Sequence, residues 1–517
     1  MELNDNRHDS VLVLDFGAQY SHLIARKIRE CGVRSELVPY DLPEAEIQKR
    51  APKGLVLSGG PTSIYDDGSP HCDPAIFSSG IPILGICYGL QLIVDFYGGK
   101  VRRSEKREYG KTEIRREHSS ELFKGLDDKI VCWMSHSDTA ETLPKDFTIL
   151  ARSNNSPAAA IQRVGSQIYG VQFHPEVSHT PRGQEILRNY LFEICHCKPS
   201  WKIETLSEQL INEIKKQVGN ERVLCAMSGG VDSATVAVLL HNAIGEKLTC
   251  IFVDHGLLRS GEADHVTKTF LEQFQIKFHR VDSKKRFLRR LDGVDDPEKK
   301  RLIIGEEFAR VFSEESVKRG PFEWLAQGTL YPDVVESSTT GSPASRIKSH
   351  HNVAGLPHWL SLKVLEPLRE LYKDEVRRLG SHLGLSDEII GRHPFPGPGL
   401  AVRILGIITP EKLRICREAS RIVEEELREA NLYSKVWQAF AIVGDDKAVG
   451  VLGDARSYGS IVTIRIVEST DAMTADWTRL PHEVMAKMSD RITNEVSGVS
   501  WVNYAISSKP PSTIEPQ

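Results

Sequence analysis

The sequence predicts an α/β protein with two open, mostly parallel sheet domains and a C-terminal α+β domain. Short apolar runs alternate with helical stretches across residues 11–200, and a second such series starts at residue 223. Strands that alternate with helices favour parallel sheets that are covered on both faces. The last hundred residues contain β-branched, alternating segments such as "SIVTIRIVES", which are typical of half-buried strands. A chain of 517 residues is long enough for three or four domains.

Two changes of composition predict the domain boundaries. The segment "CHCKPSW" interrupts the first series of strands and helices. Further on, "RHPFPGPGL" contains too many prolines and glycines for regular structure. We therefore predict domains at residues 9–199, 200–393 and 394–517. The terminal "SSKPPSTIEPQ" cannot be helical, because its prolines lack the backbone N–H that a helix needs.

Composition and charge limit the classes of partner. A formal net charge of −4 gives no general attraction to nucleic acid or to anionic lipid, so neither is expected as a partner. The longest apolar stretch, residues 81–99, is interrupted by glycines and Asp95 and predicts a core strand and helix rather than a membrane span. Nine cysteines without paired spacing, after a polar start, indicate reduced thiols and a cytoplasmic location.

A nucleophile is predicted in the motif "GICYGLQ". Cys87 lies between a predicted strand and a predicted helix and has glycines nearby, a pattern that exposes a reactive side chain on a sharp turn. The motif "FHPE" supplies His174, which can accept the thiol proton, and Glu176, which can orient the imidazole. Gly59 and Gly60 in "LSGGP" add N–H groups for an oxyanion hole. A buried, unreactive cysteine is the alternative, but three motifs together favour a catalytic triad.

The motifs "GICYGLQ" and "FHPE" resemble those of the class I glutamine amidotransferases. The resemblance implies that Cys87 attacks the side-chain amide of glutamine and releases ammonia. It also implies that further residues bind the glutamine or line the oxyanion hole, namely Tyr88, Gln91, Ser135 and His136.

A phosphate site is predicted in "VLCAMSGGVDSATV". A strand, a glycine turn and a helix form an anion site, because backbone N–H groups and the helix dipole face the ligand. The Walker lysine is missing, and the loop carries the acidic Asp232 instead. A glycine turn used for packing alone is the alternative.

The loop resembles the SGGxDS loop of the N-type ATP pyrophosphatases. This implies that ATP is cleaved between its α- and β-phosphates, with contacts from Ser228, Gly229, Gly230, Val231, Asp232, Ser233 and Val253. It also implies that Asp232 binds Mg²⁺, which prefers carboxylate oxygens, and that a lysine can come from a distant segment. Charge-rich segments further along contain histidines and glycines beside lysines, which predicts a phosphate-closing lid. The predicted lid residues are Lys348, His350, His351, Lys373 and Asp374.

Segments along the whole chain resemble the glutamine-hydrolysing GMP synthetase family, among them "LAQGTLYPDVVES", "KSHHNVAGLP", "MTADW" and "SSKPPSTIE". The resemblance implies a ligase of purine nucleotide biosynthesis: XMP is adenylated by ATP, and ammonia displaces AMP to give GMP. It also implies a homodimer through the C-terminal domain. The implied XMP-binding residues are Arg403, Gln438, Lys447, Lys509, Thr513 and Glu515, which include the basic side chains expected for a phosphate.

The C-terminal domain departs from the family pattern at several positions, including Ala472 and Ala505. These departures concern the XMP contacts and the dimer rather than the class of reaction. Two other interpretations stay open at this stage. One is a glutamine-fed ATP pyrophosphatase that acts on another acceptor, such as a tRNA base or a dinucleotide precursor. The other is a non-catalytic protein that senses nucleotides.

Overall fold

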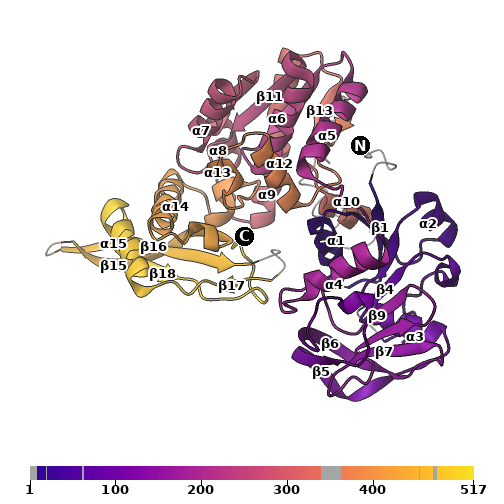
Figure 1. Ribbon diagram of the computed structural model, residues 1–517. Coiled ribbons are helices and arrows are strands. Elements are labelled where there is room, and N and C mark those ends of the chain that lie inside the picture. Colours follow the sequence, from indigo (N-terminus) through magenta and orange to yellow (C-terminus); the bar gives the residue numbers. More distant parts are fainter. Residues whose placement is uncertain (1–7, 19, 61–62, 339–361, 453–454, 470–473) are drawn as a thin grey trace. The chain divides into compact units, whose positions relative to one another are not determined.

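The computed structural model describes residues 8–18, 20–60, 63–338, 362–452, 455–469 and 474–517 (Figure 1). Across these residues, no helix combines the length and the apolar character that crossing a membrane requires. The chain divides into two compact units, residues 2–206 and residues 207–517.

The first unit is built on a nine-stranded sheet with the strand order β2-β1-β3-β4-β9-β8-β7-β5-β6. The first five strands in this order pair in parallel, and the other four pair antiparallel. The strands are β1 (Ser10–Asp15), β2 (Arg34–Pro39), β3 (Gly54–Leu57), β4 (Ile83–Ile86), β5 (Lys100–Arg116), β6 (Lys129–Thr142), β7 (Phe147–Arg152), β8 (Ala160–Arg163) and β9 (Ile168–Val171).

Four α-helices accompany this sheet: α1 (Ser21–Glu30), α2 (Glu44–Arg50), α3 (Tyr88–Phe96) and α4 (Gly183–Asn189). Helix α1 has Lys27 and Arg29 in its last turn, where basic side chains complement the helix dipole. It ends before Gly32, which has a φ of +83° and so takes the left-handed conformation common after helix ends. These helices bury apolar residues such as Ile24, Ile28 and Ile93, which also explains the apolar run at 81–99.

The second unit begins with a fully parallel, five-stranded sheet in the order β12-β11-β10-β13-β14. Its strands are β10 (Val223–Met227), β11 (Leu248–Asp254), β12 (Phe278–Asp282), β13 (Trp324–Ala326) and β14 (Lys363–Leu365). The chain first adds strands on one side of β10 and then crosses to add β13 on the other side. Such a reversal leaves a crevice at the carboxyl ends of the strands, where open α/β sheets bind ligands.

The helices of this part are α5 (Ile203–Val218), α6 (Val231–Ile244), α7 (Glu262–Lys268), α8 (Lys284–Arg290), α9 (Pro297–Arg319), α10 (Tyr331–Ser338), α12 (Lys373–His382) and α13 (Asp387–Ile390). Helix α9 starts at a proline and is capped by Asp296, whose carboxylate accepts a hydrogen bond of 2.8 Å from the N–H of Lys299.

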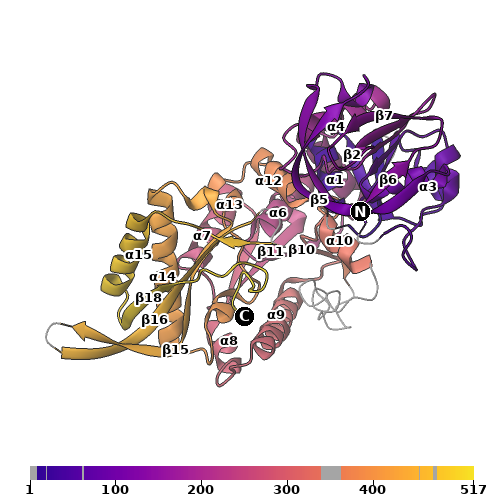
Figure 2. The same ribbon diagram turned by 90° about the horizontal axis from the view of Figure 1, so that it is seen from below.

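An antiparallel hairpin of β15 (Gln438–Leu452) and β16 (Ala455–Glu468) forms the centre of the C-terminal part. Strand β18 (Val499–Tyr504) pairs in parallel with β16, and the short β17 (Asp476–Trp477) pairs antiparallel with it. Helices α14 (Pro410–Glu429) and α15 (His482–Glu495) pack on this sheet, and the hairpin extends beyond them (Figures 1 and 2).

The two parts of residues 207–517 share one hydrophobic core. The same cluster contains Leu224 and Ile251 from the parallel sheet and Ile464 and Met488 from the C-terminal part. The predicted boundary at residue 393 therefore falls inside a compact unit, and the predicted domain limits stay a prediction. The α/β class with a C-terminal α+β part is confirmed. The antiparallel strands at one end of the first sheet were not predicted.

The terminal segment after β18 is not helical, as predicted, but it is held firmly. Arg465, which is buried, donates hydrogen bonds to the carbonyl oxygens of Ser507 (2.6 Å) and Thr513 (3.1 Å). Lys509 pairs with Ala475 as an isolated antiparallel bridge. These contacts place the segment against β16 and next to the residues predicted to bind the acceptor.

Candidate active sites

Cys87 occupies a strained turn between β4 and α3. Its φ of +53° and ψ of −100° are rare for a residue other than glycine, and such strain concentrates at functional sites. The neighbouring glycines are required by packing. A Cβ at Gly85 would lie 2.5 Å from the carbonyl of Gly89, and one at Gly89 would lie 2.4 Å from the carbonyl oxygen of Leu57. This is the predicted elbow.

His174 and Glu176 form a buried pair directly after β9. The Nδ1 of His174 lies 2.7 Å from Oε1 of Glu176, and both residues are almost inaccessible to solvent. Burial alone would lower the pKa of His174, but the Glu176 carboxylate and a hydrogen bond with Cys87 raise it well above its ordinary value. Because Nδ1 of His174 contacts Glu176, its other ring nitrogen, Nε2, is the one that can face the thiol of Cys87. The structure thus brings the three predicted triad residues together.

Strand β6 supplies the segment predicted to bind glutamine. The carbonyl oxygen of Ser135 lies 3.9 Å from Sγ of Cys87. The side chains of Gln91 and His136 both contact the carbonyl oxygen of Asp138, at 3.0 and 2.9 Å. These contacts fix the segment beside the thiol, although they direct Gln91 and His136 toward the backbone rather than toward an open space.

Gly59 and Gly60 follow β3 and lie close to the same centre. A Cβ at Gly59 would lie 3.5 Å from Cε1 of His174 and 4.0 Å from Cβ of Cys87. A Cβ at Gly60 would lie 2.8 Å from the ring of Tyr88. A side chain at Gly60 would therefore clash with Tyr88, whereas one at Gly59 would meet His174 and Cys87 at ordinary contact distances, so the backbone of this turn passes close to the triad.

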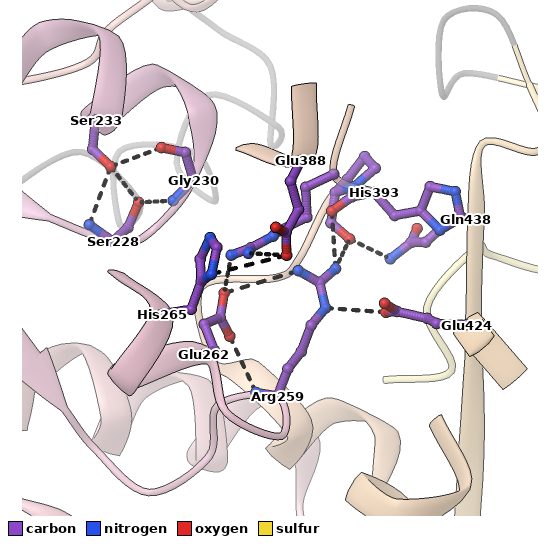
Figure 3. A network of polar contacts seen from close by, with 12 residues as sticks. Ser228, Gly230, Ser233, Arg259, Glu262, His265, Glu388, His393, Glu424 and Gln438 are labelled. Atoms are coloured by element: carbon purple, nitrogen blue, oxygen red, sulfur yellow. Dashed lines mark hydrogen bonds and ion pairs between the residues drawn. The ribbon is translucent and has the colours of Figure 1, made fainter. Parts of the chain in front are cut away.

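The predicted phosphate loop follows β10 and opens α6. The hydroxyl groups of Ser228 and Ser233 form a hydrogen bond of 3.0 Å, and the N–H of Ser228 donates to Oγ of Ser233 at 3.2 Å (Figure 3). Gly229 has a φ of +81°, which favours glycine. Within the part of the chain that the structure describes, no side chain caps the N-terminus of α6. The N–H groups of Ser228 and Gly230 are held by the two serine hydroxyls, whereas the first turn of α6 is left without a side-chain cap, as suits a helix N-terminus that binds an anion.

A lysine from a distant segment reaches this loop, as the resemblance to the ATP pyrophosphatases led us to expect. Lys373, the first residue of α12, places Nζ 2.7 and 2.6 Å from the two carboxylate oxygens of Asp232. The turn after β13 closes the other side, because a Cβ at Gly328 would lie 3.2 Å from Cβ of Asp232. Lys373 and the turn after β13 thus meet Asp232 at the carboxyl ends of β10 and β13, the edge where the strand order predicts a ligand.

Other predicted residues of this site are less well placed to act. Val253 is 2% exposed, and its side chain packs in the core near the end of β11. Asp374 is the second residue of α12, 3.4 Å from Arg378. The remaining predicted lid residues, Lys348, His350 and His351, lie outside the described residues. Their roles stay predictions.

A largely buried arginine, with 12% of its side chain exposed, connects the phosphate loop with the C-terminal part. Arg259 donates to the carbonyl oxygens of His393 (2.9 Å) and Pro394 (3.2 Å) and lies 3.4 Å from the carboxylate of Glu424 (Figure 3). Burial lowers the pKa of Arg259, although Glu424 and Glu262 oppose the shift. Glu262 also lies beside Gly229, where a Cβ would be 3.6 Å from its Oε1. This network anchors "RHPFPGPGL" to the loop.

Next to this network, three of the residues predicted to bind XMP contact one another. The buried Arg403 makes a two-pronged ion pair with Glu515, at 3.0 and 2.8 Å, and its guanidinium lies over the ring of Phe440. The side-chain amide of Gln438 donates to Glu515 and to the carbonyl oxygen of Pro394. Three of the six predicted XMP residues therefore meet at the end of the network that Arg259 begins.

The other three predicted acceptor residues lie at different distances from this cluster. Thr513 donates its hydroxyl to the carbonyl oxygen of Glu515, and Lys509 lies in the same terminal segment. Lys447 is exposed and lies nine residues beyond Gln438 on β15, which corresponds to about 30 Å along a strand. It does not share the cluster.

Three stretches of the chain are similar to known protein families. Three family models match: glutamine amidotransferase class-I at residues 12–194, NAD synthase at 202–311, and GMP synthase C terminal domain at 425–516. Two glutamine-hydrolysing GMP synthases are similar along nearly their whole length. That of Caldanaerobacter subterraneus subsp. tengcongensis is 54% identical, and that of Carboxydothermus hydrogenoformans is 55% identical; each match covers 98% of this chain and 99% of the relative.

The chain belongs to the glutamine-hydrolysing GMP synthase family. Such enzymes join glutamine hydrolysis to the ATP-dependent formation of GMP. Membership removes the two alternatives left open above, because neither another acceptor nor a non-catalytic sensor is expected of a relative at this identity.

Several residues of these sites were missed by the sequence reasoning. Gln172 touches Cys87, Arg259 anchors the segment after α13, and Arg465 holds the terminal segment. Gln172 stands inside the motif "GVQFHPE", so its position was visible in the sequence. The two arginines contact residues far away in the chain, so no short sequence motif indicates their roles.

The raised pKa of His174 predicts a pH-dependent contribution to stability. A group whose folded pKa is raised contributes stability that is complete below its unfolded pKa, about 6.5, and is lost as the pH rises through the folded value. Glu176→Gln removes the carboxylate that raises this pKa. In urea titrations, the variant should therefore lose less stability than the wild type as the pH rises above about 6.5.

Glu185→Gln is the control, because Glu185 pairs with Arg182 and not with the triad. Its curve should follow the pH dependence of the wild type. Parallel curves for Glu176→Gln and the wild type would show that Glu176 does not set the protonation of His174.

Proposed function

We propose that this chain makes GMP from XMP at two separate reaction centres. Glutamine is hydrolysed to ammonia at Cys87, and XMP is adenylated by ATP at the loop Ser228–Ser233. Ammonia then displaces AMP, so the products are GMP, AMP, pyrophosphate and glutamate. The observation that carries this proposal is the assembly of Cys87, His174 and Glu176 in one unit while the phosphate loop lies in the other.

At the first centre, the protein supplies a nucleophile, a base and an oxyanion hole. The thiol proton of Cys87 passes to Nε2 of His174 while sulfur attacks the amide carbon of glutamine. The developing oxyanion accepts hydrogen bonds from backbone N–H groups of Tyr88 and the Gly59–Gly60 turn. The imidazolium returns the proton to the leaving ammonia, and water then hydrolyses the thioester to glutamate. The short contact with Glu176 supports this role for His174.

At the second centre, the loop holds the phosphates of ATP. The open N–H groups at the start of α6 and the hydroxyls of Ser228 and Ser233 suit the β- and γ-phosphates, which leave together as pyrophosphate. Lys373 is placed to contact a phosphate oxygen. Because it begins a helix packed on α6, it acts from a fixed position.

Asp232 is the proposed ligand of Mg²⁺. Its carboxylate is partly exposed, with 29% of the side chain accessible, at the start of α6. No group of three or more acidic, histidine or cysteine side chains gathers there among the residues described. One carboxylate fits Mg²⁺ at a phosphate site, where nucleotide oxygens and water complete the octahedron. The ion, when bound, neutralises charge on the departing pyrophosphate.

The cluster of Arg403, Gln438 and Glu515, together with the terminal segment that contains Lys509 and Thr513, is the proposed XMP site. The guanidinium of Arg403 provides the charge that a nucleotide phosphate requires. Its present partner, Glu515, lies in the same cluster and holds the arginine in a defined orientation before the nucleotide arrives.

We also propose a homodimer through the C-terminal part. The end of the β15–β16 hairpin exposes Val449, Val451 and Tyr458, and Trp501 of β18 is exposed beside them with its indole N–H 3.0 Å from the carbonyl oxygen of Val449. Large apolar side chains gathered on one exposed sheet surface are typical of an interface. The nine thiols, all free and buried, support a cytoplasmic location.

Replacement of the thiol should separate the two centres. In Cys87→Ala, we expect glutamine-dependent GMP formation to fall by at least about 10³-fold, because the nucleophile is lost, while ammonia-dependent GMP formation stays within about twofold. The assay contains ATP, Mg²⁺, XMP and either glutamine or ammonium, with GMP, AMP and pyrophosphate measured. Cys72→Ala, which removes another buried thiol of the same unit, should behave as the wild type.

Loss of ammonia-dependent synthesis in folded Cys87→Ala would contradict the separation of the centres. ADP and orthophosphate as products, in place of AMP and pyrophosphate, would contradict the adenylation chemistry itself.

Asp232→Asn tests the metal assignment. Glutaminase activity should remain, whereas pyrophosphate release should fall by about 10²-fold or more and require a higher Mg²⁺ concentration for half saturation. The matched control is Asp264→Asn, whose exposed carboxylate pairs with Arg280 in the same unit. Full ligase activity in Asp232→Asn at the wild-type Mg²⁺ requirement would exclude this residue as the ligand.

A charge in the exposed apolar surface should dissociate the proposed dimer. Val451→Lys should raise the dissociation constant by about tenfold or more in sedimentation analysis, because a buried ammonium loses its hydration. Val364→Lys is the control, since Val364 is also exposed but lies on the edge strand β14. A wild-type dimer in Val451→Lys, or a monomeric wild type, would refute this interface.

A further inference from the structure

One buried side chain contacts the sulfur of Cys87 and has no role in the chemistry above. Gln172 directly follows β9 and is 0% exposed. Its side-chain Nε2 lies 3.6 Å from Sγ of Cys87, and the amide N–H donates to sulfur. A hydrogen bond to sulfur is longer than one to oxygen, because the acceptor atom is larger.

The pairing of two parallel strands fixes this contact. Ile86 of β4 pairs with Val171 of β9, so the residues that follow, Cys87 and Gln172, leave the sheet side by side. The N–H of Cys87 donates to the carbonyl oxygen of Val171 at 2.7 Å, and the N–H of Gln172 donates to Ala159 at 2.9 Å. Both backbones are held, so the distance between amide and sulfur depends little on loop motion.

The other end of the Gln172 amide shows that this residue is not explained by packing. Its Oε1 is buried and finds no hydrogen-bond partner in the described part of the chain. A buried amide oxygen without a partner is unfavourable, and an aliphatic side chain would fill the same space without that penalty. Such groups call for a functional explanation, and the contact that Gln172 does make is with the nucleophile.

We propose that Gln172 is a catalytic residue of the glutaminase reaction, whose amide N–H donates to the sulfur of Cys87. A donor stabilises the thiolate more than the thiol, because only the thiolate carries a full negative charge. His174 accepts the proton on one side of the sulfur, and Gln172 holds the resulting anion on another. The same hydrogen bond holds Sγ of Cys87 in one position, which favours its attack on the amide of a bound glutamine.

Gln172→Met tests the proposal, because methionine has a similar length and no N–H. We expect the rate of Cys87 alkylation by iodoacetamide at neutral pH to fall about tenfold, and its pH–rate profile to move upward by about one pH unit. The kcat for glutamine hydrolysis should fall about 10- to 100-fold, with a change in KM of less than about threefold. Mass spectrometry of the Cys87 peptide measures alkylation separately from the other thiols.

Two further variants keep the test decisive. Gln172→Glu places a carboxylate against the thiolate and should lower both rates more than Gln172→Met, because like charges repel. Gln172→Asn keeps the amide but withdraws its N–H by one methylene, so it should match Gln172→Met and takes its place if the methionine variant unfolds. The control is Gln162→Met on β8, whose amide contacts Tyr169 instead of Cys87 and whose loss should leave both rates unchanged.

Wild-type alkylation and hydrolysis in the folded Gln172 variants would overturn the proposal. An unchanged alkylation profile with a lowered kcat would also overturn it, because that result assigns Gln172 a structural role. The inference rests on the proposed role of Cys87, and the two are separable: glutaminase activity in Cys87→Ala would refute the role of the thiol, whereas active Gln172 variants refute only this inference.

Discussion

Both proposed reaction centres of this protein lie at the carboxyl ends of neighbouring parallel strands. Neighbouring parallel strands end at the same edge of a sheet. The pairing of the strands is therefore enough to bring together the residues that follow them. Cys87 follows β4 and Gln172 follows β9, while the SGGVDS loop follows β10 and Gly328 follows β13. In each case a helix begins after the reactive turn, and its open N-terminus favours a thiolate or a phosphate.

The guanidinium of Arg259 connects the phosphate loop with the residues proposed to bind XMP. A guanidinium out of water is costly unless its hydrogen bonds are satisfied, so Arg259 requires its carboxylate and carbonyl partners in defined positions. The carbonyl partners belong to the segment that leads into the C-terminal part, the carboxylate partner Glu424 lies on α14, and Gln438 contacts the same carbonyl oxygen of Pro394. A shared hydrophobic core supports the connection. The phosphate loop and the proposed XMP site thus lie in one compact unit.

Local pattern was enough to predict much of the fold and the centre of each site. The strands around Cys87 and the SGGVDS loop, and the helices that follow, were visible as apolar runs with glycine turns. The antiparallel end of the first sheet was missed, because alternating polar strands such as β5 and β6 do not reveal their partners. Lys447 was grouped with Gln438 by resemblance, yet the extended geometry of β15 separates them by about 30 Å.

By itself, the sequence determined the reactive groups, the turns that expose them and the family, because each depends on residues close together in the chain. Only the tertiary structure decided which distant groups meet. Lys373 reaches Asp232 across 141 positions, Arg403 reaches Glu515 across 112, and Gln172 reaches Cys87 across 85. Periodicity describes one element at a time, whereas these contacts follow from strand order and from the burial of charges that must find partners.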